Sequence, residues 1–233
     1  MTGAARTANR VAPRPPGAQD PRTDRAGAQT TAPGRPHIVI VGGTMRAGST
    51  SERLARHCGL LLQGLGASTA VFPATELELP MYAPERATLH PTALAFIRET
   101  QRCDGMIIAS PGYHGGISGL LKNALDYIEE LRADARPYLH GRAVGCIVTA
   151  AGWQGANSTL AALRSVVHAL RGWPTPLGVA VNSTQSLVDA AGELSPDIAH
   201  QLGIMARQIL QIAQWRECGS GTVAAPAALA CAA

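Results

Sequence analysis

The sequence predicts a three-layer α/β domain built on a five-stranded, mostly parallel sheet. Short apolar runs alternate with longer amphipathic stretches over residues 37–216, which is the order expected of strands joined by covering helices. The strands are apolar at nearly every position rather than at every second one, so we expect both faces of the sheet to be covered. About 200 residues follow Pro36, enough for one domain with a sizeable core.

Each predicted strand is a run of apolar or β-branched residues, and the runs are 37–41, 68–72, 105–110, 143–150 and 177–181. In the segments between them, apolar residues recur three or four positions apart, which predicts helices with one buried face. The helices are placed, in chain order, by Leu54, Cys58, Leu61, Leu62 and Leu65; by residues 91–101; by Leu120, Leu121, Ala124, Leu125, Ile128 and Leu131; by Leu160, Leu163, Val166, Val167 and Leu170; and by Ile198, Leu202, Met205, Ile209 and Ile212.

Three parts of the chain differ in composition. We expect residues 1–36 to be a disordered basic tail, 37–216 to form the folded domain and 217–233 to be a flexible C-terminal tail, because the end segments hold too few large apolar side chains to offset the entropy of ordering. Residues 1–36 hold six arginines and two acids, and the rest of the chain has fourteen basic and fourteen acidic residues. The formal charge of +4 therefore belongs to the tail, and we expect no nucleic-acid-binding face on the domain.

Other patterns exclude further classes of protein. No apolar run approaches the roughly 18 residues of a membrane-spanning helix, and the N-terminal arginines are not followed by the apolar stretch of a secretory signal. The five cysteines form no C-x-x-C pair and have no histidine at metal-ligand spacing, which argues against a zinc site or a disulfide framework. We therefore expect a cytoplasmic protein without a membrane or metal partner.

Three loops at the carboxyl ends of strands are the candidate binding site, because ligands of such sheets bind there. The first loop, residues 42–52, leads into a helix and holds Thr44, Arg46, Ser49 and Ser51. Hydroxyls, an arginine and helix N–H groups are typical of a monophosphate site. The G-K-[ST] end of a P-loop and the G-x-G-x-x-G of a dinucleotide-binding fold are both missing. An ordinary turn with a helix cap from Ser49 or Ser51 is the alternative.

The second and third candidate loops combine glycines with bulky side chains. Residues 111–116 follow the third strand as Pro-Gly-Tyr-His-Gly-Gly, and residues 150–156 follow the fourth strand and contain Trp153. Glycine lets the backbone approach a flat ring closely, with Tyr113 and His114 as candidate contacts. A packed or solvated side chain unrelated to any ligand is the alternative for Tyr113 and His114, and a hydrophobic plug is the alternative for Trp153.

Residues 37–214 resemble the NAD(P)H-dependent FMN reductases, which have a flavodoxin-like fold. The first loop is similar to the family's G-S-x-R-x-x-S-x-N phosphate motif, and residues 111–127 are similar to its P-E-Y-N-x-S-x-P-x-x-L-K-N-A-x-D-W motif. The resemblance implies that FMN is bound, with NADPH or NADH as the hydride donor. The implied FMN contacts are Thr44, Arg46, Ser49 and Ser51 at the phosphate, Pro111, Gly112, Tyr113, His114, Gly115 and Gly116 along the ring, and Gly152 and Gly155 near its pyrimidine side.

Three departures from the second motif bear on substrate choice. Gly112 stands where the family usually has Glu, His114 where it has Asn, and Ser118 where it has Pro. Backbone groups carry much of the FMN binding, so we expect the departures to affect the exposed face of the ring. The sequence offers no catalytic acid, base or nucleophile apart from His114 as a candidate, as expected where the cofactor supplies the chemistry.

The function expected from this resemblance is hydride transfer from NAD(P)H to FMN, with reduced FMN supplied to a partner monooxygenase. The first alternative is a reductase that keeps FMN bound and reduces quinones, azo compounds or metal oxyanions. The second is a non-enzymatic electron carrier like flavodoxin, against which Arg46 and the balanced charge of the domain argue, and the third is a relative that binds no FMN. Because family members are usually dimers or tetramers, a homodimer or homotetramer is also implied, with the helix from Lys122 to Tyr127 near the interface.

Overall fold

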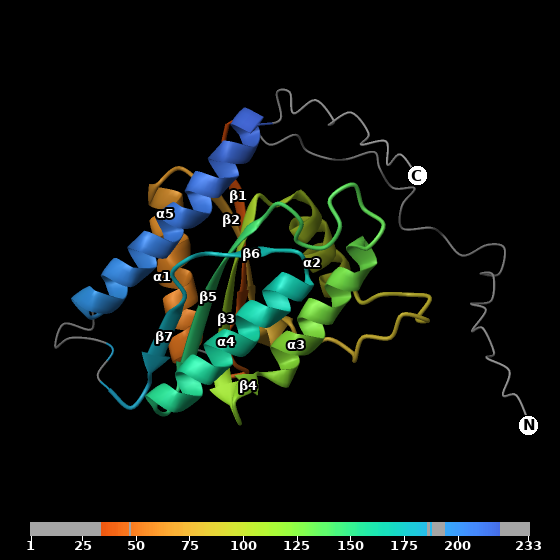
Figure 1. The fold of residues 1–233 in the computed structure, drawn as a ribbon. Coiled ribbons are helices and arrows are strands. Elements are labelled where there is room, and N and C mark those ends of the chain that lie inside the picture. The colour runs from red at the N-terminus through yellow and green to blue at the C-terminus, as the bar shows by residue number, and fades with distance from the viewer. Residues whose placement is uncertain (1–33, 47, 186, 188–193, 220–233) are drawn as a thin grey trace, which may run out of the picture.

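The computed structural model describes residues 34–46, 48–185, 187 and 194–219. Within these ranges the chain forms a sheet between two layers of helices, so the predicted α/β class is confirmed (Figure 1). The strands are β1 His37–Gly42, β2 Ser68–Pro73, β3 Gly105–Tyr113, β4 Gly116–Ile117, β5 Ala143–Ala150, β6 Trp173–Pro174 and β7 Val179–Asn182. The helices are α1 Thr50–Gly64, α2 Pro91–Arg102, α3 Gly119–Asp126, α4 Trp153–Ala169 and α5 Pro196–Gly219, with short 3₁₀ helices η1 Ala74–Glu76 and η2 Tyr127–Leu131.

The strands lie in the order β2, β1, β3, β5, and both β6 and β7 pair with the far side of β5. The five predicted strands are β1, β2, β3, β5 and β7, and every pairing among them is parallel. Helices α1 and α5 lie on one side of the sheet, and α2, α3 and α4 lie on the other (Figure 1). The predicted three layers are therefore present, with a parallel five-stranded core.

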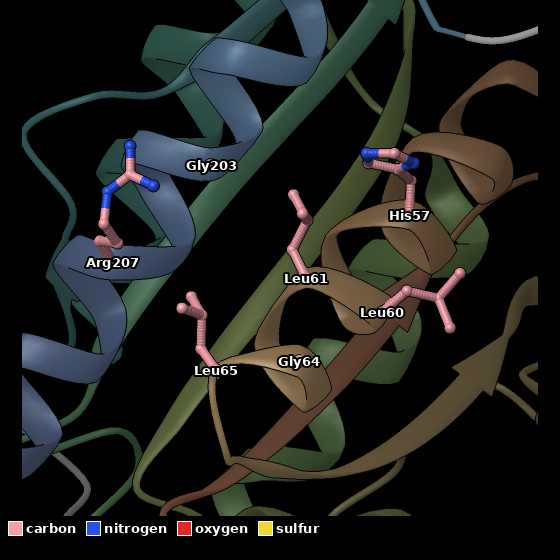
Figure 2. Close-up of a pocket in the computed structure, with 7 residues that line it drawn as sticks. All are labelled: His57, Leu60, Leu61, Gly64, Leu65, Gly203 and Arg207. Atoms are coloured by element: carbon pink, nitrogen blue, oxygen red, sulfur yellow. The ribbon is translucent and has the colours of Figure 1, made fainter.

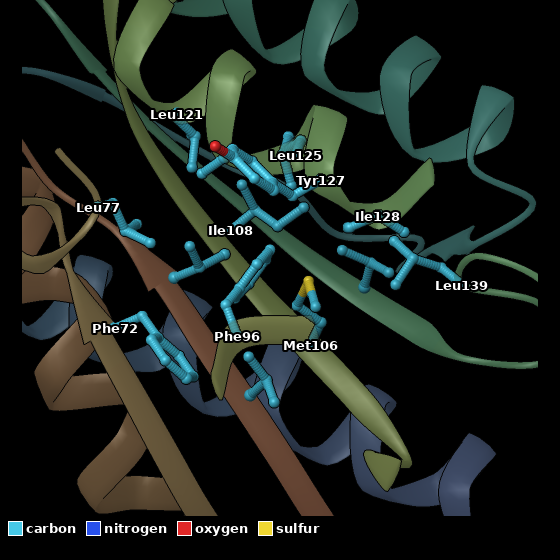
Figure 3. Packing of buried hydrophobic residues seen from close by; sticks show 14 of the residues in the cluster. Phe72, Leu77, Phe96, Met106, Ile108, Leu121, Leu125, Tyr127, Ile128 and Leu139 are labelled. Atoms are coloured by element: carbon cyan, nitrogen blue, oxygen red, sulfur yellow. The ribbon is translucent and has the colours of Figure 1, made fainter. Parts of the chain in front are cut away.

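Alternate side chains of β1, β3 and β5 fill two separate cores. Val39 and Ile108 pack with α2, α3 and α4, whereas their neighbours Ile38 and Ile107 pack with α1 and α5. Figure 3 shows the first of these cores, where Phe96 of α2 lies among side chains of the sheet and of η2. Because both faces are buried, an apolar residue is favoured at nearly every strand position.

Two short strands, β4 and β6, were not predicted, and both lie outside the five-stranded parallel core. β3 runs three residues beyond the predicted end at 110, because the chain turns back and β4 pairs with it antiparallel. Proline and glycine after residue 110 are typical of a loop, and the sequence pattern therefore ended the strand too early. β6 pairs with the start of β5, so it shares the edge of the sheet with β7.

The described fold extends past both ends of the predicted domain. Arg35 Nε donates to Gly66 O (3.1 Å), and Pro36 O accepts a hydrogen bond from Ser68 N (2.8 Å). At the other end, α5 continues to Gly219. Residues 1–33 and 220–233, which make up most of the two predicted tails, lie outside the described residues. Within the described part of the chain, no helix is long and apolar enough to cross a membrane.

A buried arginine ties together the edge of the sheet at which β5 begins. Arg142 is 0% exposed and directly precedes β5. Its guanidinium donates to Gln101 O (2.6 Å) in the last turn of α2, to Cys103 O (3.2 Å) and to Tyr138 O (3.0 Å). Carbonyl oxygens at the C-terminal end of a helix favour a nearby cation. One side chain therefore joins the end of α2 to the segment that leads into β5.

Replacing Arg142 with Met should lower the free energy of unfolding by about 3 kcal/mol, because several buried carbonyl groups lose their donor. Urea denaturation followed by circular dichroism measures the change. Arg132→Met is the control, since the Arg132 side chain is 70% exposed and lies 3.9 Å from a single carboxylate oxygen. Equal stability of the two variants would contradict the structural role of Arg142.

Candidate functional site

The carboxyl ends of β1, β3 and β5 bring the three candidate loops to one edge of the sheet. Gly42, the last residue of β1, pairs with Ala109 of β3, and Pro111 of β3 pairs with Thr149 of β5. From β1 the chain proceeds to β2 on one side and to β3 and β5 on the other. Such a reversal of strand order is where open α/β sheets bind ligands.

Glycines turn the first loop sharply away from β1. Gly42 and Gly43 have φ angles of 137° and 110°, and a Cβ added at Gly42 would lie 1.9 Å from Ala109 O. Gly43 N donates to the same oxygen (3.1 Å). Both the positive φ and the contact between backbones require glycine here, and the loop therefore starts directly against β3.

Thr44 and Arg46 are accessible polar side chains near the start of the first loop. Arg46 N donates to Thr44 Oγ1 (3.1 Å), which shapes a local turn. Arg46 is exposed, and Thr44 is partly exposed. Within the described ranges the Arg46 guanidinium makes no ion pair, so it is available to an anion from solution.

The two serines lie behind the loop rather than on its surface. Ser49 caps α1, because its Oγ accepts from Glu52 N (3.4 Å), and it lies 3.4 Å from Ser51 Oγ. Both serines are buried. The helix cap that the sequence offered as an alternative for Ser49 is therefore confirmed, and the role of the two hydroxyls at a phosphate stays a prediction.

The second loop is a β-hairpin that ends in two exposed side chains. β3 continues to Tyr113, and the chain returns from Gly116, with His114 and Gly115 at φ angles of 51° and 82°. Two successive positive φ angles are typical of a two-residue type I′ turn, in which Asn-Gly is favoured. The Asn usual in the family would suit this turn better than His114 does. Tyr113 is 54% exposed, so it is not a packed side chain.

Gly112 lets the end of β3 approach α4 and the third loop. A Cβ added at Gly112 would lie 2.8 Å from Thr159 Oγ1 and 3.0 Å from Ala150 Cβ. Thr159 Oγ1 is buried and, in the described structure, has no hydrogen-bond partner. The Glu usual in the family does not fit at position 112 without a shift of α4 or the third loop, because a packed interior leaves no room for it.

Asn182, at the end of β7, holds the third loop, and the sequence analysis did not single it out. Asn182 Oδ1 accepts hydrogen bonds from Gly152 N (2.9 Å) and Thr184 N (3.1 Å). Two backbone N–H donors fix which end of the amide is the oxygen. The available signal was a lone Asn directly after the apolar run of the fifth predicted strand, since polar residues at that end of a strand lie at the ligand-binding edge.

The N-terminus of α4 is open. Its N-cap residue, Gly152, offers no side chain, whereas Ser49 caps α1 and Ser118 caps α3. The first N–H groups of α4 and the positive end of its dipole therefore lie uncapped at the loop edge. Trp153, the first residue of α4, is 50% exposed, so the hydrophobic-plug alternative for this residue is wrong.

Two residues of the second motif serve the fold instead of the loops. Asn123 Nδ2 donates to Leu79 O and Pro80 O (3.1 Å each), and its Oδ1 accepts from Tyr82 N (2.8 Å). Tyr127 OH also donates to Pro80 O (2.8 Å). These bonds fix residues 79–82 against α3 and the start of η2, which explains the buried amide of Asn123 and hydroxyl of Tyr127.

Two other features lack the properties of a nucleotide site. A groove of about 360 Å³ between α1 and α5 is lined by Leu60, Leu61 and Leu65 among others (Figure 2). These residues lie in the second half of α1 and at its C-terminal end, away from the loop that precedes the helix. Cys58 and Cys146 are buried, and burial raises the pKa of each thiol to about 12, so neither is a nucleophile near neutral pH. The described ranges hold no cluster of three or more His, Cys, Asp or Glu suited to a metal ion.

Comparison with protein families shows to which family the chain belongs. The model of the NADPH-dependent FMN reductase family matches residues 36–186, a span that includes all seven strands and the three candidate loops. The chain belongs to this family. The resemblance drawn from the two motifs is confirmed, and the family's name joins FMN with NADPH.

Relatives with related names match this family member over part of their length. The NADPH-dependent FMN reductase ArsH of Acidithiobacillus ferrooxidans is 31% identical over 139 residues, which cover 60% of this chain and 56% of that protein. An NAD(P)H-dependent FMN reductase of Pseudomonas aeruginosa is 29% identical over 179 residues, which cover 75% of this chain and 93% of that protein. The chain spans 50% to 61% of the length of the ArsH proteins that it matches.

Solved structures share the fold at low sequence identity. FerB of Paracoccus denitrificans, an NAD(P)H:(acceptor) oxidoreductase, has a TM-score of 0.60 and 19% identity, with 79% of this chain and 98% of that chain covered. A flavodoxin, WrbA-like protein of Agrobacterium tumefaciens has a TM-score of 0.51 and 15% identity, with 78% and 98% covered. The family member therefore has a flavodoxin-like fold.

Replacing Asn182 with Ala should loosen the third loop and weaken FMN binding about fivefold, because one hydrogen bond to Gly152 N, worth about 1 kcal/mol, is lost. Titration of the apoprotein with FMN, followed by flavin fluorescence, measures the affinity. Gln211→Ala, an exposed position on α5, is the control. If the folded Asn182→Ala variant binds FMN like the parent protein, the third loop is not part of the flavin site.

Proposed function

We propose that this chain is an NAD(P)H-dependent FMN reductase whose flavin site lies at the carboxyl edge of the sheet. One observation carries the proposal: an arginine and hydroxyl loop before α1 and an uncapped N-terminus of α4 lie at the ends of strands that flank β3. The first suits a phosphate, and the second suits a group that gains negative charge on reduction. Membership of the FMN reductase family supports this assignment.

The three loops would divide the contacts to FMN between them. Thr44 and Arg46 would bind the phosphate, with Ser49 and Ser51 behind them ordering the loop. The hairpin of residues 111–116 would lie along the ring, where Gly112 already permits close contact with the third loop. Backbone groups of Gly152 and Gly155 would lie near the pyrimidine side of the ring.

Bound FMN would supply the redox chemistry, in which NAD(P)H gives up a hydride, water supplies a proton, and NAD(P)⁺ leaves. The residues of the chain would bind and orient the flavin and stabilise the charge that develops on it. N–H groups at the start of α4 would donate to the negative charge that develops on the pyrimidine side. Tyr113, His114 and Trp153 are exposed beside the loops and would contact the nicotinamide or an acceptor, with His114 as a candidate proton donor to that acceptor.

Reduced FMN would then leave the site and supply a partner monooxygenase. The exposed Tyr113 and Trp153 border an edge open to solvent, which suits exchange of a flavin. The alternative is direct reduction of a quinone, azo compound or metal oxyanion by FMN that stays bound. Names among the relatives support it, since an NADPH azoreductase of a Bacillus species is 22% identical over 166 residues.

Steady-state oxidation of NADPH with different acceptors separates these two functions. The proposal predicts turnover under air that rises and saturates with added free FMN, and no further turnover with quinones or azo dyes. The matched control is the same assay with riboflavin, which lacks the phosphate. Quinone or azo turnover that is independent of added FMN would contradict flavin release and favour the alternative.

Replacing Arg46 with Ala should weaken FMN binding by about 1.5–3 kcal/mol, because one charge-assisted contact to the phosphate is lost. Riboflavin binding should be unchanged, since riboflavin offers no phosphate. Titrations of the apoprotein with both flavins measure this, and Arg98→Ala, an exposed arginine on α2, is the control. Unchanged FMN affinity would show that the first loop is not the phosphate site.

Assembly as a homodimer or homotetramer is also proposed on the family resemblance. The resemblance implies a contact near the helix from Lys122 to Tyr127, and a hollow of about 390 Å³ beside that helix, lined by Lys122, Tyr138 and Leu170 among others, would be part of it. Light scattering of the purified protein measures its mass, and a monomer would refute this part of the proposal.

A variant that begins at Gly34 tests whether flavin reduction needs residues 1–33, and it keeps the contact of Arg35.

A further inference from the structure

A carboxylate lies inside the loop proposed to hold the phosphate. Glu52 Oε2 accepts a hydrogen bond from Gly48 N (3.0 Å), between Arg46 and the start of α1. The Glu52 side chain is only 13% exposed, and a Cβ added at Gly43 would lie 3.2 Å from Glu52 Cβ. One backbone N–H of the loop therefore already has an anionic acceptor from the chain itself.

The Glu52 carboxylate forms an ion pair with Arg56. Arg56, one helical turn further along α1, places Nε and Nη2 each 2.9 Å from Glu52 Oε1. Arg56 is bound to Oε1, whereas the other oxygen, Oε2, is the one that contacts the loop at Gly48 N. Within the described residues of the first loop, 42–46 and 48–52, Arg46 is the one cationic side chain.

Capping of α1 explains the length of the Glu52 side chain but not its charge. Ser49 Oγ accepts from Glu52 N (3.4 Å), and the Glu52 side chain accepts from a backbone N–H just before the helix. The arrangement is similar to a capping box, but the Glu52 side chain accepts from Gly48 N, one residue before the N-cap Ser49. In a capping box, glutamine serves as well as glutamate. The negative charge is therefore additional to what the cap needs.

We infer that Glu52 weakens the binding of the FMN phosphate by the first loop. Glu52 thereby determines how strongly the site prefers FMN over riboflavin. This inference rests on the proposed flavin site. A carboxylate beside a phosphate repels it, and the Gly48 N–H is already used. The phosphate contact is then weaker than Arg46 alone would make it, so FMN exchanges more readily with solution. A reductase that releases its flavin requires such exchange.

The variant Glu52→Gln keeps the cap and removes the charge. FMN should bind the apoprotein at least about fivefold more tightly, because ~1 kcal/mol of repulsion is removed, and it should dissociate more slowly. Riboflavin affinity should stay the same, since the repelled group is absent. Added salt should shrink the difference in FMN affinity between parent and variant, because ions screen the repulsion; a purely structural effect would not respond to salt.

Two further variants control the comparison. Arg56→Gln leaves the Glu52 charge unbalanced and should weaken FMN binding. Glu129→Gln removes the carboxylate from another helical Glu and Arg pair, in which Glu129 Oε1 lies 3.9 Å from Arg132 Nη1, and should change neither affinity. Thermal melts of the apoproteins check that each variant is folded.

The outcomes separate this inference from the proposed function. If Glu52→Gln leaves FMN affinity unchanged or lower while Arg46→Ala weakens it, the inference is overturned and the flavin site stands. Tighter binding of FMN and riboflavin to the same degree would also overturn it, because the effect would then come from loop structure. If Arg46→Ala has no effect on FMN either, the phosphate site and the proposed flavin site fail together.

Discussion

The close contact of β1, β3 and β5 at their carboxyl ends is the constraint on which the candidate site depends. Backbone lies against backbone where Gly42 meets Ala109, so the first loop starts beside the hairpin that extends β3. Gly112 has no side chain, and the hairpin can therefore lie against Ala150 and α4. Without these two contacts the three loops would be separate surface turns instead of one binding edge.

Charge at this edge is arranged locally rather than over the whole surface. The positive surplus of the chain lies in residues 1–36, and the rest of the sequence is balanced. Two helix N-termini lie at the edge, and they differ: α1 is capped by Ser49 and carries the Glu52 carboxylate, whereas α4 has no side-chain cap. A nucleotide at this edge would therefore meet the uncapped, positive N-terminus of α4. It would also meet the N-terminus of α1, where a side-chain cap and a carboxylate are already present.

Much of the fold could be predicted because burial of both sheet faces leaves a continuous apolar signal. The predicted strand 143–150 coincides with β5 for this reason. The hairpin at Tyr113 was missed because it depends on pairing across space, which overrides the loop signal of the Pro and Gly before it. The two motifs identified Arg46 and the first two loops, and the position of a strand end identified the third. The contacts of Asn182 and Glu52 follow only from folding.

Reduction of bound flavin in a single turnover tests the central claim most directly. The apoprotein is loaded with FMN, freed of excess flavin and oxygen, and mixed with NADPH while the visible absorbance of oxidised flavin is followed. The account predicts rapid loss of that absorbance in the parent protein, faster than for free FMN mixed with NADPH. Flavin that binds but keeps its absorbance after NADPH is added would contradict a reductase and favour a non-enzymatic electron carrier.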